Sequence, residues 1–152
     1  MTTRDIQREE TKKRIYDVAF KLFDEFGYDK VKVSDIAKAA NVSVGSVYYH
    51  YKNKEAIIDY GYYEFDQMLK EAYEKQTFDS EREAILFLID FQIKDVFLDI
   101  GLKMTTICFK NQINAENTYL HSDERYLYQK LLENLNNIQP VSYTHLRAHE
   151  TG

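Results

Sequence analysis

A short stretch around residue 50 carries side chains that suit contact with nucleic acid. On a helix beginning at Val44, the outward positions and the residues just beyond are Gly45, Ser46, Tyr49, His50, Lys52 and Lys54. The glycine lets a backbone come close, the hydroxyl and imidazole groups can hydrogen-bond to base edges, and the lysines offer positive charge to phosphates. A solvated helix end is the alternative, but such an end is rarely this aromatic. The stretch therefore predicts a DNA contact surface.

Other chemistries find no support in the residue spacing. Di-iron sites in helical bundles use Glu-x-x-His, and none of the four histidines has a glutamate three residues before it. No cysteine or histidine cluster has zinc spacing, no glycine-rich phosphate loop is present, and Cys108 has no evident base partner. We therefore expect no enzymatic activity, no metal site and no cofactor.

The composition predicts an all-α protein. With 44% hydrophobic and 30% charged residues, five glycines and one proline, the chain suits stacked amphipathic helices and offers few turns for hairpins. Cys108 is the only cysteine, which fits a reducing compartment. The first ten residues are charged and no apolar run is long enough to cross a bilayer, so we expect a cytoplasmic protein with no membrane partner.

The charge is divided unevenly along the chain. The net charge of -5 by itself argues against nucleic acid, because phosphate affinity comes largely from Lys and Arg. Residues 1–54, however, carry 11 Lys and Arg against 8 Asp and Glu, whereas residues 55–139 carry 8 against 16. This asymmetry indicates two modules with different partners.

Helical spacing of apolar residues predicts the elements that position the polar stretch. One helix is expected over 11–26, a second over 33–40, and a third over 44–51, capped by Ser43 and with Val47 on its inner face. Two helices, a tight turn and a third helix with a polar outer face make the helix-turn-helix geometry, in which the third helix enters the major groove. A helical protein-interaction or small-molecule-binding module without DNA is the alternative.

The rest of the chain also shows helical periodicity. A long fourth helix is expected over 53–75. A capping-box pattern at 80–83 opens a helix over 84–100 that is apolar on nearly every side, so we expect it in the middle of a bundle. Helices over 102–113 and from 123 onward follow. The last of these carries its apolar side chains at Leu127, Leu131, Leu135 and Ile138.

The stretch 35–57, DIAKAANVSVGSVYYHYKNKEAI, resembles the signature of the TetR family of transcriptional regulators. The resemblance extends over residues 11–58 and includes Phe23, Phe26, Gly27 and Tyr28. It implies an all-helical protein with a helix-turn-helix domain followed by a helical-bundle sensor and dimerisation domain. It also implies a homodimer that binds a palindromic double-stranded operator and responds to an unknown small-molecule effector, most often as a repressor.

The resemblance further assigns roles within the DNA-contact surface. It implies that Tyr48 and Lys54 hold phosphates, while Gly45, Ser46 and Tyr49 face base edges or sugars and His50 lies between these roles. Val44 stands where the family often has Lys or Arg, so a contact can be missing there. Lys32 replaces the usual Ser or Thr cap of the second helix, which weakens that cap or adds a phosphate contact. The full set of candidate DNA-binding residues is Lys32, Ser34, Val44, Gly45, Ser46, Tyr48, Tyr49, His50, Lys52 and Lys54.

The second domain is rich in aromatic residues. At helical spacing these are usually core residues, but a sensor domain of this family implies that some line an effector cavity. The candidate ligand-binding residues are Phe87, Phe91, Met104, Cys108 and Phe109.

We expect three segments along the chain: the helix-turn-helix domain over 1–55, a partial effector and dimerisation domain over 56–139, and a non-native tail over 140–152. The tail, PVSYTHLRAHET and a final glycine, resembles the translation of a transposon end joined to a sequencing adapter, and a native disordered tail is the alternative. On the first interpretation the second domain is incomplete and its last helix exposes an apolar stripe.

Overall fold

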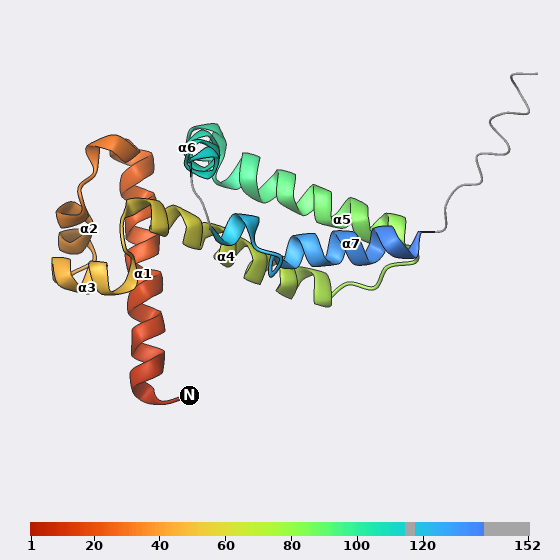
Figure 1. Ribbon diagram of the computed structural model, residues 1–152, viewed down its shortest axis with the longest axis horizontal. Coiled ribbons are helices and arrows are strands. Elements are labelled where there is room, and N and C mark those ends of the chain that lie inside the picture. Colours follow the sequence, from red (N-terminus) through yellow and green to blue (C-terminus); the bar gives the residue numbers. More distant parts are fainter. Residues whose placement is uncertain (115–117, 139–152) are drawn as a thin grey trace, which may run out of the picture.

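A computed structural model describes residues 1–114 and 118–138, and of residues 95–97 it describes the backbone alone. Within these ranges all regular structure is helical, which confirms the predicted all-α class (Figure 1). The seven α-helices are α1 (Thr3–Phe26), α2 (Val33–Ala39), α3 (Val44–His50), α4 (Lys54–Glu74), α5 (Glu81–Ile93), α6 (Gly101–Ile113) and α7 (Tyr126–Asn137). The shorter elements are the 3-10 turns η1 (Tyr28–Lys30) and η3 (Tyr119–His121) and the π-helical segment η2 (Lys94–Asp99).

The first helix is longer than its apolar pattern predicts. It begins at Thr3 rather than near residue 11, because Thr2 and Asp5 form a capping box. The Thr2 hydroxyl accepts from the Asp5 N–H at 3.2 Å, and the Asp5 carboxylate accepts from the Thr2 N–H at 3.1 Å. The added turns carry few apolar residues and project beyond α2 and α3 in Figure 1.

The caps of the next helices explain where they begin. The Ser43 hydroxyl accepts from the Ser46 N–H at 3.0 Å and so caps α3, which confirms the predicted start of that helix. The Asn53 carboxamide likewise caps α4 by accepting from the Ala56 N–H at 2.9 Å. At α2 the Lys32 side chain gives no cap, but the Asp35 carboxylate accepts from the Lys32 N–H at 2.8 Å.

One closed core holds α1, α2 and α3 together with the start of α4. Its fully buried members include Ile15, Phe23, Ile36 and Val47, and the inward position predicted for Val47 is confirmed. Ile57 and Ile58, in the first turns of α4, also belong to this core. Helix α4 therefore contributes to this core and, farther along, to the core of the second part of the molecule.

The predicted central position of the helix over 84–100 is wrong. The α-helix ends at Ile93 and continues as the π-helical η2, and within Glu81–Ile93 only Ala84 and Leu88 are buried. Leu86 is 56% exposed, and Ile89 and Ile93 are also exposed. The reason is that α5 packs against α4 and α7 on one side alone, and nothing in the described ranges covers its other side (Figure 1).

The remaining boundaries lie close to the predictions. Helix α6 begins at Gly101, whose φ of +82° is a left-handed conformation that glycine adopts without strain. Helix α7 begins at Tyr126 and buries Leu127, while Leu135 and Ile138 stay exposed. The predicted tail over 140–152 lies outside the described residues.

Candidate nucleic-acid interface

Helix α3 is held rigidly on the core by its inner face and by the residue that follows it. Val47 is buried between α1 and α2, and Tyr51 is buried directly after the helix. The Tyr51 hydroxyl donates to the Lys12 carbonyl oxygen of α1 at 2.8 Å, a link across 39 residues of sequence. A short helix fixed in this way presents its outer side chains in a defined orientation.

The outer face of α3 is aromatic and exposed. Tyr49 is 69% exposed and Tyr48 53% exposed, and Val44 and Gly45 are exposed as well. Ser46 and His50 are half-buried. A Cβ added at Gly45 would meet nothing closer than the Ser43 hydroxyl at 3.8 Å, so packing within this chain does not require a glycine there.

The basic residues around α3 differ in their freedom. Lys52, after α3, and Lys32, before α2, are exposed, as is Ser34 in the first turn of α2. Lys54 is instead half-buried, since its Nζ donates to the Tyr28 carbonyl oxygen at 2.8 Å and lies 4.4 Å from the centre of the Tyr28 ring. A phosphate bound by Lys54 would have to share its ammonium group with this internal contact.

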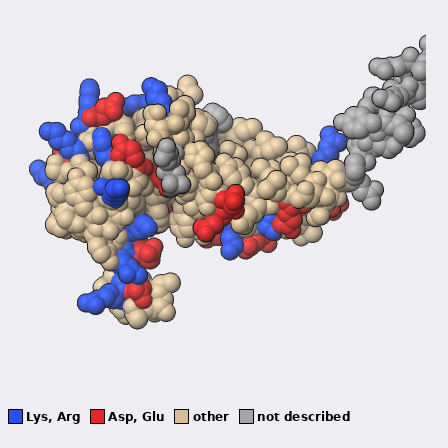
Figure 2. Space-filling model, in the orientation of Figure 1, with Lys and Arg blue, Asp and Glu red and all other residues tan. Residues whose placement is uncertain are grey.

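Figure 2 shows Lys and Arg side chains gathered on the part of the molecule formed by α1, α2 and α3. The visible face of the elongated second part is mostly uncharged, with acidic groups and a few basic ones along its lower edge (Figure 2). The uneven distribution of charge along the sequence therefore corresponds to an uneven distribution over this face of the molecule.

Arg8 is a neighbour of the outer face that the sequence analysis did not include. It lies on the added turns of α1, with Tyr49 and Asp5 beside it, and the Tyr49 hydroxyl followed by Asp5 raises the pKa of the guanidinium. The Thr2-x-x-Asp5 capping pattern is the signal that could have placed Arg8 on a helix. Residue type alone could not identify Arg8 as a neighbour of this face, because acidic residues stand close to it in the sequence.

His50 stands at the other edge of α3. Partial burial, followed by the positive charge of Lys12 on α1, lowers the pKa of its imidazole. Arg8 adds to this effect and Glu9 opposes it. The imidazole is therefore neutral near pH 7 and can both donate and accept a hydrogen bond.

A cavity of about 160 Å³ lies where α1, α4, α6 and α7 meet. Of the predicted ligand-binding residues, Cys108 and Phe109 line it. Phe87 and Phe91 do not, because they pack against Tyr73 and Phe65 in the core between α4, α5 and α7. Met104 is not a lining residue either, since it is buried in the core of the first part.

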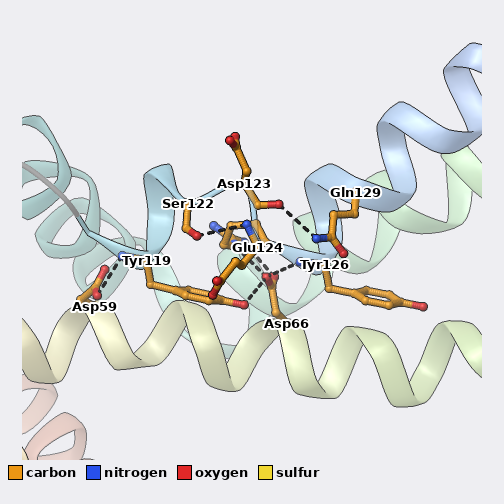
Figure 3. Close-up of polar contacts among 9 residues, drawn as sticks. Asp59, Asp66, Tyr119, Ser122, Asp123, Glu124, Tyr126 and Gln129 are labelled. Atoms are coloured by element: carbon orange, nitrogen blue, oxygen red, sulfur yellow. Dashed lines mark hydrogen bonds and ion pairs between the residues drawn. The ribbon is translucent and has the colours of Figure 1, made fainter.

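A buried ion pair borders this cavity (Figure 3). The Arg125 guanidinium donates to both carboxylate oxygens of Asp66, at 2.8 and 3.0 Å, and both side chains are almost fully buried. Asp66 also accepts from the Tyr119 hydroxyl at 3.0 Å and from the Tyr126 N–H at 2.8 Å. The Tyr119 N–H in turn donates to Asp59 at 3.1 Å, so η3 and the start of α7 are fixed to α4. Sequence periodicity could not reveal this pairing, because its partners lie 59 residues apart.

Among the described residues, no group of three or more His, Cys, Asp or Glu is placed to hold a metal ion. No helix in the same part of the chain is both long and apolar enough to cross a membrane.

The fold and the outer face of α3 define the class: an all-helical protein with an N-terminal helix-turn-helix unit. Residues 15–60 match the family described as "Bacterial regulatory proteins, tetR family". The chain therefore contains a helix-turn-helix domain of the TetR family, as the resemblance of residues 35–57 predicted.

Individual relatives agree with this assignment. The chain is 28% identical over 124 residues to the biofilm operon icaADBC HTH-type negative transcriptional regulator IcaR of Staphylococcus epidermidis, covering 74% of this chain and 66% of that protein. It is 42% identical over 48 residues to the HTH-type transcriptional regulator AcrR of Shigella flexneri, covering 32% of this chain and 22% of that protein. It thus spans at most 66% of the length of these two relatives.

Among solved structures, the crystal structure of superantigen PfiT is similar with a TM-score of 0.53 at 20% identity. The match covers 84% of this chain and 64% of that one. At this identity the likeness concerns the fold alone.

Proposed function

We propose that the protein is a DNA-binding transcriptional regulator that places α3 in the major groove of its operator. The observation that carries the proposal is the exposed pair Tyr48 and Tyr49 on a short helix fixed to a closed core. Ser46 and His50 would add hydrogen bonds to bases, and Lys32, Ser34 and Lys52 would contact the backbone. The relatives named above are transcriptional regulators, so a regulator without catalytic activity, acting in the cytoplasm, is the proposed role.

One helix of this length reads few base pairs, so we propose that the acting form is a homodimer on a palindromic operator. In helix-turn-helix dimers the half-sites are spaced by about 34 Å or a multiple of it. The exposed apolar side chains of α5 and α7 offer a surface on which a second copy could pack. Analytical ultracentrifugation with and without operator DNA tests this part directly.

The test of DNA binding is a selection of bound duplexes from a random pool, followed by fluorescence anisotropy over a salt series. We expect binding that weakens steeply as salt rises, because phosphate contacts release counterions. Tyr49→Ala is expected to change the preferred sequence, whereas Lys52→Ala weakens all sequences alike. Lys70→Ala is the matched control, because it removes an exposed lysine of α4 far along the sequence from α3. It is expected to leave both the preferred sequence and the affinity unchanged.

Binding that ignores salt, or no binding at any salt, would contradict the proposal. The chain would then be a helical interaction or small-molecule-binding module. The cavity beside α1 supports a further part of the proposal, namely that a small-molecule effector controls operator binding.

A further inference from the structure

We infer that the cavity between α1, α4, α6 and α7 binds a compact, uncharged aromatic molecule with one hydrogen-bond acceptor, and that α1 responds to its presence. The inference rests on the proposed function in one respect, since a response of α1 matters only if the protein binds DNA. Binding of the small molecule itself does not depend on DNA. Four features of the cavity carry it: its charge, its polar anchor, its size and its contact with α1.

The charge of the lining excludes ions. Arg125 is the sole charged residue among the described residues that line the cavity. Both oxygens of Asp66 already bind its guanidinium, so the pair brings no net charge to the site. A carboxylate ligand would have to be desolvated without a free cation to compensate it, and a cationic ligand would meet the guanidinium. The aromatic lining, which includes Phe20, Tyr62 and Phe109, favours a ring instead.

Tyr62 provides the polar anchor. Its hydroxyl is buried beside the Cys108 thiol, a weak acceptor, and no stronger hydrogen-bond partner lies within reach among the described residues. Burial raises the pKa of Tyr62, so the hydroxyl keeps its proton and is available as a donor. A buried hydroxyl with only a thiol beside it is poorly satisfied, and a ligand that brings an oxygen acceptor would recover free energy.

The volume suits a ligand of about one ring. The cavity measures about 160 Å³, and an apolar protein cavity of about 150 Å³ is known to hold benzene. A long chain or a second ring would extend out of the cavity through its open side.

Helix α1 forms part of that wall. Tyr16 and Phe20 line the cavity, and a Cβ added at Gly61 of α4 would lie 3.2 Å from the Phe20 Cζ and 3.2 Å from the Tyr16 hydroxyl. The glycine therefore allows the close approach of α1 to α4. Phe20 also packs on Phe23, with ring centres 6.2 Å apart, and Phe23 is fully buried in the core beneath α2 and α3. A ligand that moves the Phe20 ring thus acts on the core that fixes α3.

The test uses the full chain without DNA and three probes of similar size: anisole, toluene and benzoate. Isothermal titration calorimetry is expected to show that anisole binds more tightly than toluene by roughly three- to tenfold, the equivalent of one neutral hydrogen bond. Benzoate is expected to bind at least about tenfold more weakly than anisole, because its charge is not compensated. Tyr62→Phe should remove the preference for anisole over toluene, and Phe87→Leu, in the separate aromatic core, should preserve it.

The response of α1 is read from amide chemical shifts. Saturating anisole should shift Phe23 and Val47 as well as residues of α4 and α6, and Gly61→Ala should weaken anisole binding by crowding the two rings. Equal or tighter binding of benzoate, no binding of any probe, or shifts confined to α4 and α6 would overturn the inference. Anisole binding with the expected preference in a protein that binds no DNA would leave the inference standing and remove the proposed function instead.

Discussion

The two parts of the molecule differ in how completely they bury their apolar residues. Among the described residues, the core of the helix-turn-helix part has twelve buried members, from α1 to α4 and α6, whereas the core between α4, α5 and α7 has four. Leu86 of α5 and Leu132 of α7 remain 56% and 60% exposed. The first part is closed by α1 to α4 together with α6, and the second part leaves apolar side chains of α5 and α7 exposed.

Polar groups contribute differently to the two parts as well. In the first part they act mainly as caps at Thr2, Ser43 and Asn53, and the side chains of Tyr51 and Lys54 add two longer-range bonds to backbone carbonyl oxygens. In the second part the buried pair Asp66 and Arg125 joins α4 to the start of α7 over 59 residues of sequence. The comparison indicates that the second part depends on one buried polar contact where the first depends on apolar packing.

The largest expected effect follows from breaking that pair. Asp66→Ala leaves the Arg125 guanidinium buried without its partner, which typically costs about 3–5 kcal/mol of folding free energy. Hydrogen exchange measured by mass spectrometry should show peptides from α5 and α7 opening while those from α2 and α3 stay protected. Glu133→Ala, which breaks the exposed pair with Lys130, is the matched control, with an expected cost of about 0–1 kcal/mol. Equal loss of protection in both parts would show that they unfold as one unit.

The next effect compares the two cores directly. Ile36→Ala and Leu88→Ala each remove a fully buried aliphatic side chain, one from each core. Such changes cost about 2–5 kcal/mol, and less where the surroundings can collapse into the space. We therefore expect a cost near the upper end for Ile36 and near the lower end for Leu88, measured as local opening free energies by hydrogen exchange. The reverse order would contradict the description of the second core as the more open one.

A smaller effect separates two lysines of the proposed DNA surface. Lys54→Ala removes the contacts with the Tyr28 carbonyl and ring and is expected to lower stability by roughly 1–2 kcal/mol. Lys52→Ala removes an exposed side chain and should change stability by less than about 0.5 kcal/mol while reducing the salt dependence of DNA binding by about one unit of slope. Urea unfolding followed by circular dichroism gives the first quantity and anisotropy the second. Unchanged stability of Lys54→Ala would mean that its internal contact contributes nothing.

The smallest expected effect is a pH dependence from His50. Its pKa is lower in the folded protein than its ordinary value of 6.5, so the unfolded chain takes up a proton first as the pH falls. The contribution of His50 to the free energy of unfolding is fully present above pH 6.5 and is lost as the pH falls from there through the lowered pKa. The difference in unfolding free energy between the protein and His50→Gln, measured from pH 7.5 to 5.5, should shrink towards acid. A difference that stays constant would show that the imidazole is not perturbed.

The sequence determined the helix-turn-helix part because its signals are local. Caps such as Ser43 and Asn53 and the inward position of Val47 follow from helical period and from the chemistry of free N–H groups, which act over a few residues. The same local information identified the family and the aromatic outer face of α3. It missed the early start of α1, because those turns carry a cap but little apolar pattern.

Only the tertiary structure decided which long-range contacts those helices make. The apolar composition of α5 predicted burial on all sides, yet burial depends on which other helices cover it, and α4 and α7 cover one side. In the same way, Lys54 was expected to hold a phosphate, and the fold gives its Nζ an internal partner as well, the Tyr28 carbonyl oxygen at 2.8 Å. Helix α6 was expected to line a cavity, and α1 was not. Helix α1 also lines it because the close approach at Gly61 exists only once α1 and α4 have packed. Periodicity along a chain reports which face of a helix is apolar, and the partner of that face is set by the packing of segments far apart in sequence.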